Sequence, residues 1–357
     1  MNSRRYFSFP LALALALTML AVFGSKAFAQ GGQTSLDPFA ALPESELIIV
    51  VDTQRILRDA VPRILANDQK TLLQINTGID GVKGLMGIDA RAIRRVVFGA
   101  RNLSPSMKPE NFSGVVIVEG IDTEKALGFM RSGVKGKYTE ETYGGSTVYT
   151  VTKASEPKLM FDLAVAALDG GMLALGTPAE LRASIDALAG RAPRADAALV
   201  GTVSRHTSSL VSIGFNIPPS LVSSIAASGS SEGGPNEMIG KALSTLKTFN
   251  AALGMTPTGY DMFMAARVES GEQAKSLSDM LIGLQKLALM EQPKNERDKM
   301  MQGLLRNVLI SSEGSEVQVK TEVPQATVNM LMQSAKGGQQ QITNKKPLVR
   351  RRTRRRR

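Results

Sequence analysis

Histidine and cysteine, which carry much of the nucleophilic, acid–base and transition-metal chemistry of proteins, are nearly absent from this sequence. The chain has 357 residues, no cysteine and one histidine, His206. A disulfide, a lipid-bearing cysteine and a metal cluster built from histidine or thiolate ligands are therefore excluded. His206 could act as a lone acid–base group or metal ligand, but we interpret it as a polar side chain in a loop or at a strand edge. We predict no cofactor, no metal and no catalytic residue.

Three short patterns have the letters of a catalytic or nucleotide site without its context. Gly229-Ser230-Ser231-Glu232-Gly233 matches the nucleophile elbow of hydrolases, yet the only histidine precedes that serine instead of following it. The segment Gly234 to Lys241 resembles a phosphate-binding loop, but it is one residue too long and Ala242 replaces the magnesium-binding hydroxyl. Serine and lysine also stand three apart, without the companion motifs of penicillin-recognising enzymes, at Ser132/Lys135, Ser155/Lys158 and Ser244/Lys247.

Carboxylates and aromatic residues point to no substrate either. Glu140 and Glu141 are adjacent, so on a strand their side chains would face opposite ways, and Asp169 suits a tight turn with Gly170-Gly171 better than a pair with Asp162. The chain has no tryptophan and only five tyrosines, which argues against an aromatic platform for carbohydrate. Methionine is abundant in the second half, and we interpret it as core filling, with an adaptable hydrophobic groove as the alternative, at Met255, Met262, Met264, Met280, Met290, Met300, Met301, Met330 and Met332.

Residues 1–29 have the pattern of a cleaved export signal. Arg4 and Arg5 precede an apolar run from Leu11 to Gly24, and Ala27-Phe28-Ala29 forms a small-x-small cleavage site. The run, of about 14 residues, is shorter than the ~20 of a membrane-spanning helix. We therefore expect a periplasmic or extracellular protein without a transmembrane segment in its mature chain. The start Ser3 to Phe7 resembles the twin-arginine export motif, and the general secretion route and an uncleaved anchor remain alternatives.

The formal charge of +11 resides at the two ends of the chain. Three cations lie in the signal and nine between Lys345 and Arg357, which leaves −1 for residues 30–344. Residues 336–357 are predicted to be a disordered tail, whose arginines could bind anionic envelope polymers or lipid head groups. The tail contains no aromatic residue for base stacking, so nucleic acid is disfavoured, and a solvated tail without a specific partner is the alternative. The candidate polyanion-binding residues are Arg350, Arg351, Arg352, Arg354, Arg355, Arg356 and Arg357.

The body between these ends predicts two related α+β units, residues 37–198 and 199–335. Strands are expected in the first unit over 47–51, 95–100, 114–119, 147–152, 163–168 and 172–176. Helices are expected from Asp52 or Thr53 to Leu65, over 70–86, from Asp122 to Met130, and after a capping box formed by Thr177 and Glu180.

The second unit repeats much of this order of elements. Strands are expected over 210–215, 260–268, 308–312 and 316–322, and helices after Pro219, over 237–253, from Ser270 to Met290 and over 324–332. Residues 226–236, rich in glycine and serine, read as a flexible excursion. The expected fold is α+β, with two antiparallel sheets that each carry helices on one face in a ferredoxin-like style. Whether the two sheets join, and which oligomer forms, stay open.

The segment from Leu42 to Asp52, followed by strand and capped-helix units, resembles a group of uncharacterised exported bacterial proteins with repeated α+β units. The resemblance spans about residues 40–335 and implies an exported α+β protein, without any functional residue. We expect a non-enzymatic binding or structural protein of the bacterial cell envelope. The alternatives are an exported hydrolase with an unfamiliar site and a polyanion binder that acts through the tail.

Overall fold

A single antiparallel sheet organises the chain. The computed structural model describes residues 37–104, 112–157, 159–206, 208–229 and 244–331. Its 12 strands run in the order β11-β12-β10-β9-β8-β1-β2-β3-β7-β6-β5-β4. In sequence they are β1 (Leu47–Val51), β2 (Arg95–Arg101), β3 (Ser113–Glu119), β4 (Thr139–Tyr143), β5 (Ser146–Val151), β6 (Leu163–Leu168), β7 (Met172–Gly176), β8 (Ser209–Asn216), β9 (Thr248–Met255), β10 (Gly259–Arg267), β11 (Leu309–Glu313) and β12 (Glu316–Pro324).

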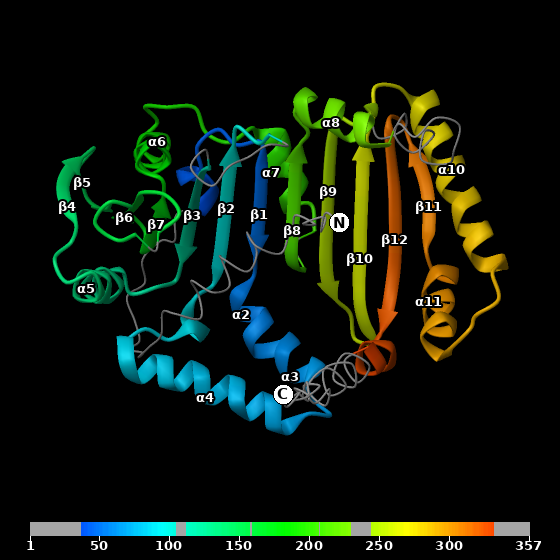
Figure 1. Ribbon diagram of the computed structural model, residues 1–357, viewed down its shortest axis with the longest axis horizontal. Helices are drawn as coiled ribbons and strands as arrows, with labels where there is room; N and C mark the ends of the chain where they lie inside the picture. Colours follow the sequence, from blue (N-terminus) through cyan, green and yellow to red (C-terminus); the bar gives the residue numbers. More distant parts are fainter. Residues whose placement is uncertain (1–36, 105–111, 158, 207, 230–243, 332–357) are drawn as a thin grey trace, which may run out of the picture.

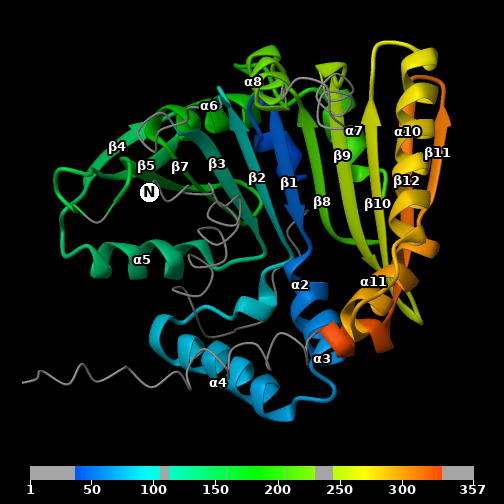
Figure 2. The same cartoon turned by 45° about the vertical axis from the view of Figure 1, so that its right-hand side comes forward.

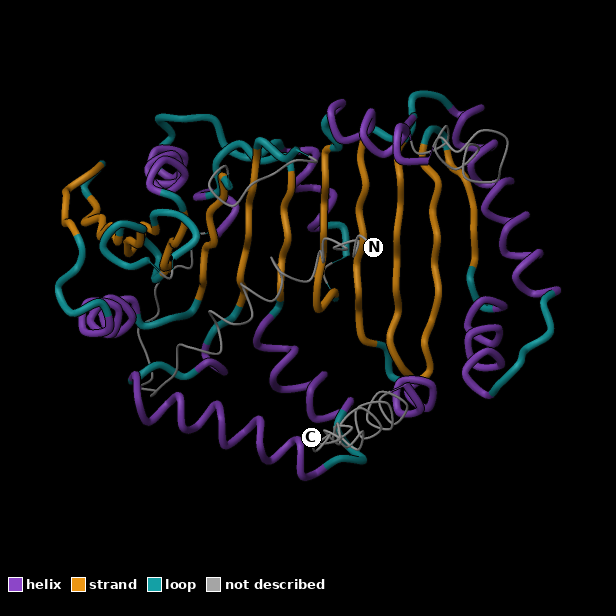
Figure 3. Tube along the Cα trace, in the orientation of Figure 1, coloured by secondary structure: helices purple, strands orange, loops and turns teal. Residues whose placement is uncertain are grey.

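The α+β class and the antiparallel pairing are confirmed. The question of whether two sheets join is answered by β1, which pairs with β2 on one side and with β8 on the other, so one sheet continues through both predicted units. The sheet twists strongly along this length. In Figures 1 and 3, β9, β10 and β12 are seen from the side over their full length, whereas β6 and β7 are viewed nearly end-on.

Helices connect the strands and pack on both sides of the sheet. They are η1 (Pro38–Ala41), α2 (Thr53–Arg55), η2 (Ile56–Ala60, a π-helix), α3 (Val61–Ile64), α4 (Gln69–Met86), η3 (Ala90–Ala92), α5 (Thr123–Gly133), α6 (Pro178–Leu188), α7 (Ala197–Ser204), α8 (Pro219–Gly229), α10 (Gly271–Met290) and α11 (Glu296–Arg306). A short helix over 325–331 follows β12. Among the described helices, none combines the length and the hydropathy needed to cross a bilayer.

Most of the predicted helix starts are confirmed by their capping geometry. The side chains of Asp52, Asp122 and Ser270 accept hydrogen bonds from the first-turn amides of α2, α5 and α10, which satisfies donors that a helix start leaves unpaired. Helix α6 begins after Thr177 as expected, but the Thr177 side chain makes no capping bond. The predicted capping box is wrong, because the carboxylate of Glu180 instead accepts from Arg101 at 2.7 Å and Ser113 at 2.6 Å.

One predicted helix is a strand. The prediction of a helix over 237–253 rests on a run of good helix formers, yet residues 248–253 belong to β9, which pairs with β8 and β10 along both edges. Residues 237–243 lie outside the described part of the chain. Ladder hydrogen bonds on both sides therefore override the local helix propensity of Ala251, Ala252 and Leu253. The elements β4, α7 and α11 were not predicted.

The larger apolar core lies between the sheet and the helices η1, α6 and α7. Ile48, Val97 and Ile117 project from the sheet into this core and are fully buried. Leu181 and Ile185 meet them from α6, and Leu199 and Val203 meet them from α7. We call this side of the sheet the covered face.

The opposite side of the sheet is covered mainly at its margins. Helix α5 packs against β3, β5, β6 and β7, and α10 packs beside β11 and β12. The segment α2–α3 lies at the lower ends of β8 and β10, and Figure 1 shows α4 extending along the lower margin. Figure 2, turned to bring the right side forward, shows α10 standing in front of the outer strands.

Candidate functional site

The centre of the sheet displays large apolar side chains on the side whose middle no described helix covers. The register places Ile213, Ala251 and Met264 of three adjacent strands on one side of the sheet, and Ser212, Ala252 and Phe263 on the other. The second set faces the covered side and is buried, whereas the first set is only partly buried. We call this exposed apolar side of the central strands the open face.

The open face is formed by side chains of strands β1, β2, β8, β9, β10 and β12. Each is partly exposed to solvent, and Leu253 reaches 40% exposure. The members are Ile49, Phe98, Ile213, Phe215, Phe249, Ala251, Leu253, Met262, Met264, Ala266 and Val319. No member carries a charge. The charged side chains of β10 and β12 all lie on the other side of the sheet, at Asp261, Arg267, Glu316, Lys320 and Glu322.

Side-chain size is distributed against the usual pattern on β8 and β9. The covered side of these strands carries small or polar residues, including Ser212, Gly214 and Asn250, while phenylalanine, isoleucine and leucine occupy the open face. Gly214 is required there, because a Cβ would lie 2.7 Å from Val203 Cγ1 and 3.0 Å from Leu199 Cδ1 of α7. A sheet side that keeps its largest apolar groups partly exposed to water is typical of a binding surface.

The described helices frame the open face without crossing its middle. In Figure 1 none of the described helices passes over the middle of β9 or β10. Helix α10 borders the face on the right, α8 lies across the upper ends of the strands, and α4 and α2–α3 lie along the lower ends.

Tyr260 marks the lower end of the open face. Its ring packs with Ala60 and Leu210 beneath α2–α3 and is 5% exposed, and the guanidinium carbon of Arg63 lies 5.6 Å from the ring centroid. Burial raises the pKa of Tyr260, and the positive charge of Arg63 opposes this shift only in part. The phenol is therefore protonated and available as a hydrogen-bond donor.

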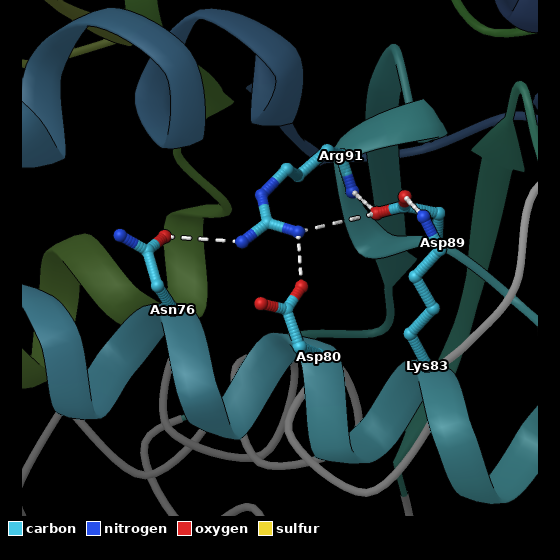
Figure 4. A network of polar contacts seen from close by, with 5 residues as sticks. All are labelled: Asn76, Asp80, Lys83, Asp89 and Arg91. Carbon is cyan, nitrogen blue, oxygen red and sulfur yellow. Dashed lines mark hydrogen bonds and ion pairs between the residues drawn. The ribbon is translucent and has the colours of Figure 1, made fainter.

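Helix α4 is attached to the rest of the molecule by polar contacts more than by burial. None of its side chains described for burial is fully buried, and Leu73 and Leu85 are 67% and 77% exposed. Figure 4 shows the attachment, in which Arg91 donates to Asp80 at 2.7 Å and to Asn76 at 3.1 Å.

Asp89 completes this network. Its carboxylate accepts from Lys83 of α4 at 2.7 Å and from the backbone N–H of Arg91 at 3.0 Å. Burial alone would raise the pKa of Asp89, but the contacts with Lys83 and Arg91 outweigh burial and lower it. The ionised carboxylate thus joins α4 to the turn that precedes β2.

His206 lies in a loop, as expected from the sequence. Its ring packs against Phe263 with 4.4 Å between centroids, on the covered side of the sheet, and Nε2 is buried without a partner among the described residues. Burial lowers the pKa of His206, and Arg205 adds to this effect. No group of three histidine, cysteine or acidic residues capable of holding a metal occurs in the described ranges.

The other sequence candidates do not assemble into a site. Glu141 pairs with Arg182 at 2.6 Å, whereas Ser132 donates to the carbonyl of Gly128 within α5, as a helix serine commonly does. Lys247 pairs with Glu269 at 2.7 Å. The elbow-like serine 231, the loop-like segment 234–241, Lys158 and the tail arginines 350–352 and 354–357 lie outside the described residues.

Among the features noted in the sequence, only the abundance of methionine involves residues of the open face. Met262 and Met264 lie on the open face, as the groove alternative would require. The core-filling interpretation is wrong for Met290, Met301 and Met330, which are exposed. The phenylalanine and aliphatic residues of the open face could not be recognised from the sequence. A strand shows the same alternation of residue types whichever of its two sides is buried.

Comparison with known proteins supplies no family. No family model matches the chain, and no curated protein matches it. Among solved structures, crystal form III of TP0453 aligns at a TM-score of 0.43 and 11% identity, covering 85% of this chain and 100% of the other. Crystal form I of TP0453 aligns at 0.41 and 10% identity, covering 85% and 98%.

Proposed function

We propose that this protein is an exported, non-enzymatic binding protein of the bacterial cell envelope, and that its ligand is a hydrophobic small molecule held on the open face. The observation that carries the proposal is the display of uncharged, partly exposed side chains such as Phe249, Leu253 and Met264 across the sheet centre. Burying such side chains under an apolar ligand gains about 25 cal/mol per Å² of surface removed from water.

The chemistry of the open face favours an apolar ligand over a peptide strand. Strands β9 and β10 are paired on both edges, so their backbone N–H and C=O groups are already hydrogen-bonded. They cannot pair with an added peptide strand. The side chains of the face offer area but no ionic contact. Flexible thioethers at Met262 and Met264 suit ligands of variable shape.

The proposal also includes the predicted export signal and the predicted division into units 37–198 and 199–335. Carrying or sequestering a ligand requires neither cysteine nor a metal cluster, and the chain has no cysteine and no such cluster in its described ranges. The predicted unit boundary, between residues 198 and 199, falls within α7, and the continuous sheet lets both units contribute strands to one binding surface.

A neutral hydrophobic dye such as Nile red tests this proposal. The purified protein should bind the dye saturably, with a gain in fluorescence. Leu253→Glu places a charge on the open face and should weaken dye affinity about tenfold, a change of about 1.4 kcal/mol. Ser311→Glu is the matched control, because Ser311 is exposed and its register with Gln318 places it on the other side of the sheet.

The proposal fails if the purified protein gives no saturable dye signal. It also fails if Leu253→Glu and Ser311→Glu bind the dye as tightly as each other while both retain the circular dichroism spectrum of the wild type.

A further inference from the structure

The lower end of the open face contains buried polar atoms that lack hydrogen-bond partners among the described residues. They are Tyr260 Oη, Thr321 Oγ1 and Gln325 Oε1. Buried polar side-chain atoms are nearly always paired in folded proteins, because an unpaired one loses its hydration without compensation. Tyr260 and Thr321 stand on adjacent strands and Gln325 donates to Arg63, which packs over Tyr260, so a ligand at this end of the face could pair with such atoms.

Two of these atoms are hydroxyls on the open side of adjacent strands. Tyr260 of β10 pairs with Val323 of β12, and Met262 pairs with Thr321, so Tyr260 and Thr321 are diagonal neighbours. Diagonal neighbours on one side of a sheet lie within reach of long side chains. The hydroxyls of Tyr260 and Thr321 therefore lie on the same side of the sheet, near the α2–α3 segment.

Arg63 supplies positive charge at the same place. It packs over Tyr260, donates from Nη2 to the carbonyl of Pro257 at 2.8 Å, and accepts through its own carbonyl from Gln325. Within the described ranges no carboxylate lies at ion-pair distance from Arg63. Two unpaired hydroxyl donors beside an unneutralised guanidinium form a site for a compact anion.

The α2–α3 segment above Tyr260 is held by apolar packing and hydrogen bonds, with no ion pair among the described residues. Residues Ile56–Ala60 form a π-helix, a geometry that is rare and concentrates at functional sites. Ile56, Ala60 and Ile64 pack on Tyr260 and Leu210, and Arg63 donates to the backbone carbonyls of Thr256 and Pro257. A compact head group can therefore enter beneath η2 without breaking an ion pair in the described part of the chain.

We propose, resting on the function proposed above, that the ligand is a long-chain fatty acid. Its carboxylate accepts hydrogen bonds from Tyr260 and Thr321 beside Arg63, and its hydrocarbon chain lies along the open face. Strand β10 extends about 20 Å from Tyr260 to Ala266, at roughly 3.4 Å per residue. Methionine, leucine and phenylalanine side chains line that length, which suits an extended alkyl chain.

Competition against Nile red separates the head group from the chain. Hexadecanoate and hexadecan-1-ol share one alkyl chain, so the hydrophobic contribution is common to both. The wild type should release the dye at about tenfold lower concentration of hexadecanoate than of the alcohol. Tyr260→Phe and Thr321→Val each remove one hydroxyl, and each should reduce this preference severalfold without changing the response to the alcohol.

Tyr149→Phe is the matched control. Tyr149 lies on the same side of the sheet beneath α5 and has an arginine, Arg131, 5.4 Å from its ring centroid, but its hydroxyl accepts from that arginine. This variant should keep the full preference for hexadecanoate. Hexadecyl phosphate provides a further arm, and it should bind more weakly than hexadecanoate because its head is larger.

The outcomes distinguish the two proposals. Equal displacement by the acid and the alcohol, or an unchanged preference in both Tyr260→Phe and Thr321→Val, overturns the carboxylate site and leaves the apolar surface standing. Stronger displacement by hexadecyl phosphate than by hexadecanoate also overturns it. Failure of the wild type to bind Nile red at all would instead reject the function proposed above.

Discussion

At the scale of single residues, the size of the side chain decides which side of the central strands is packed. Gly214 lets α7 approach β8 closely, since Val203 Cγ1 and Leu199 Cδ1 occupy the space that a Cβ would take. Ile213 and Phe215, its neighbours in the chain, face the other way and remain partly exposed. On β8 and β9 the covered side is therefore close-packed with small residues, and the large residues lie partly exposed on the open face.

The close approach at Gly214 predicts a loss of stability on substitution. Gly214→Ala should lower the free energy of unfolding by about 1–3 kcal/mol, because α7 or β8 must shift to admit the methyl group. Urea denaturation measures the change. Gly128→Ala in α5 is the control, since nothing lies within 4 Å of its Cβ, and it should be neutral or stabilising. Equal stability of both variants would contradict this account of the covered face.

At the scale of elements, α4 differs from the other long helices in its dependence on ionic contacts. Helix α10 buries Ala274 and Leu277 against the sheet, whereas α4 is attached through Asp80, Lys83 and Arg91. Such an attachment responds to pH. The pKa of Asp89 is lowered in the folded protein, so its stabilising contribution is complete above the ordinary value of 3.8. That contribution is lost as the pH falls through the lowered value.

Asp89→Asn should reproduce the loss at neutral pH, because an amide neither neutralises Lys83 nor accepts as strongly from Arg91. Hydrogen exchange resolved by peptide should show about tenfold weaker protection in α4, with β1 and β2 unchanged, which corresponds to about 1.4 kcal/mol. Asp122→Asn is the control, because Asp122 caps α5 and has no contact with α4 among its hydrogen bonds. Unchanged exchange in α4 would show that apolar packing holds this helix.

The elements also show which parts of the fold can be predicted from sequence patterns. Strand β1, the start of α5 and the β6–β7 turn were predictable, because a buried apolar run, an aspartate cap and two glycines with φ of 76° and 72° are local signals. Strand β9 was not, since its alanines favour a helix until β8 and β10 bind both edges. The Glu180 carboxylate was assigned to the helix start, but Arg101 is the stronger partner.

At the scale of the whole molecule, the open face exists because no described helix lies over the middle of the sheet. Alternation on β8 and β9 predicts two sides but does not say which one helices cover, and that depends on where α7 and α10 pack. The sequence offered an adaptable groove only as the alternative to methionines that fill the core, and Met262 and Met264 lie on the open face. The pairing of a distant Arg63 with Tyr260 had no sequence signal.

Methyl NMR of the methionines tests the central claim most directly, because methionines sample both sides of the sheet and its margins. The purified protein, labelled with carbon-13 at the methionine methyl groups, is titrated with hexadecanoate. The account predicts large shifts for Met262 and Met264, and none for Met172, which is fully buried on the covered side, or for Met290, which is 79% exposed on α10. Unchanged signals from Met262 and Met264 under saturating ligand would contradict the account, and so would shifts confined to Met290.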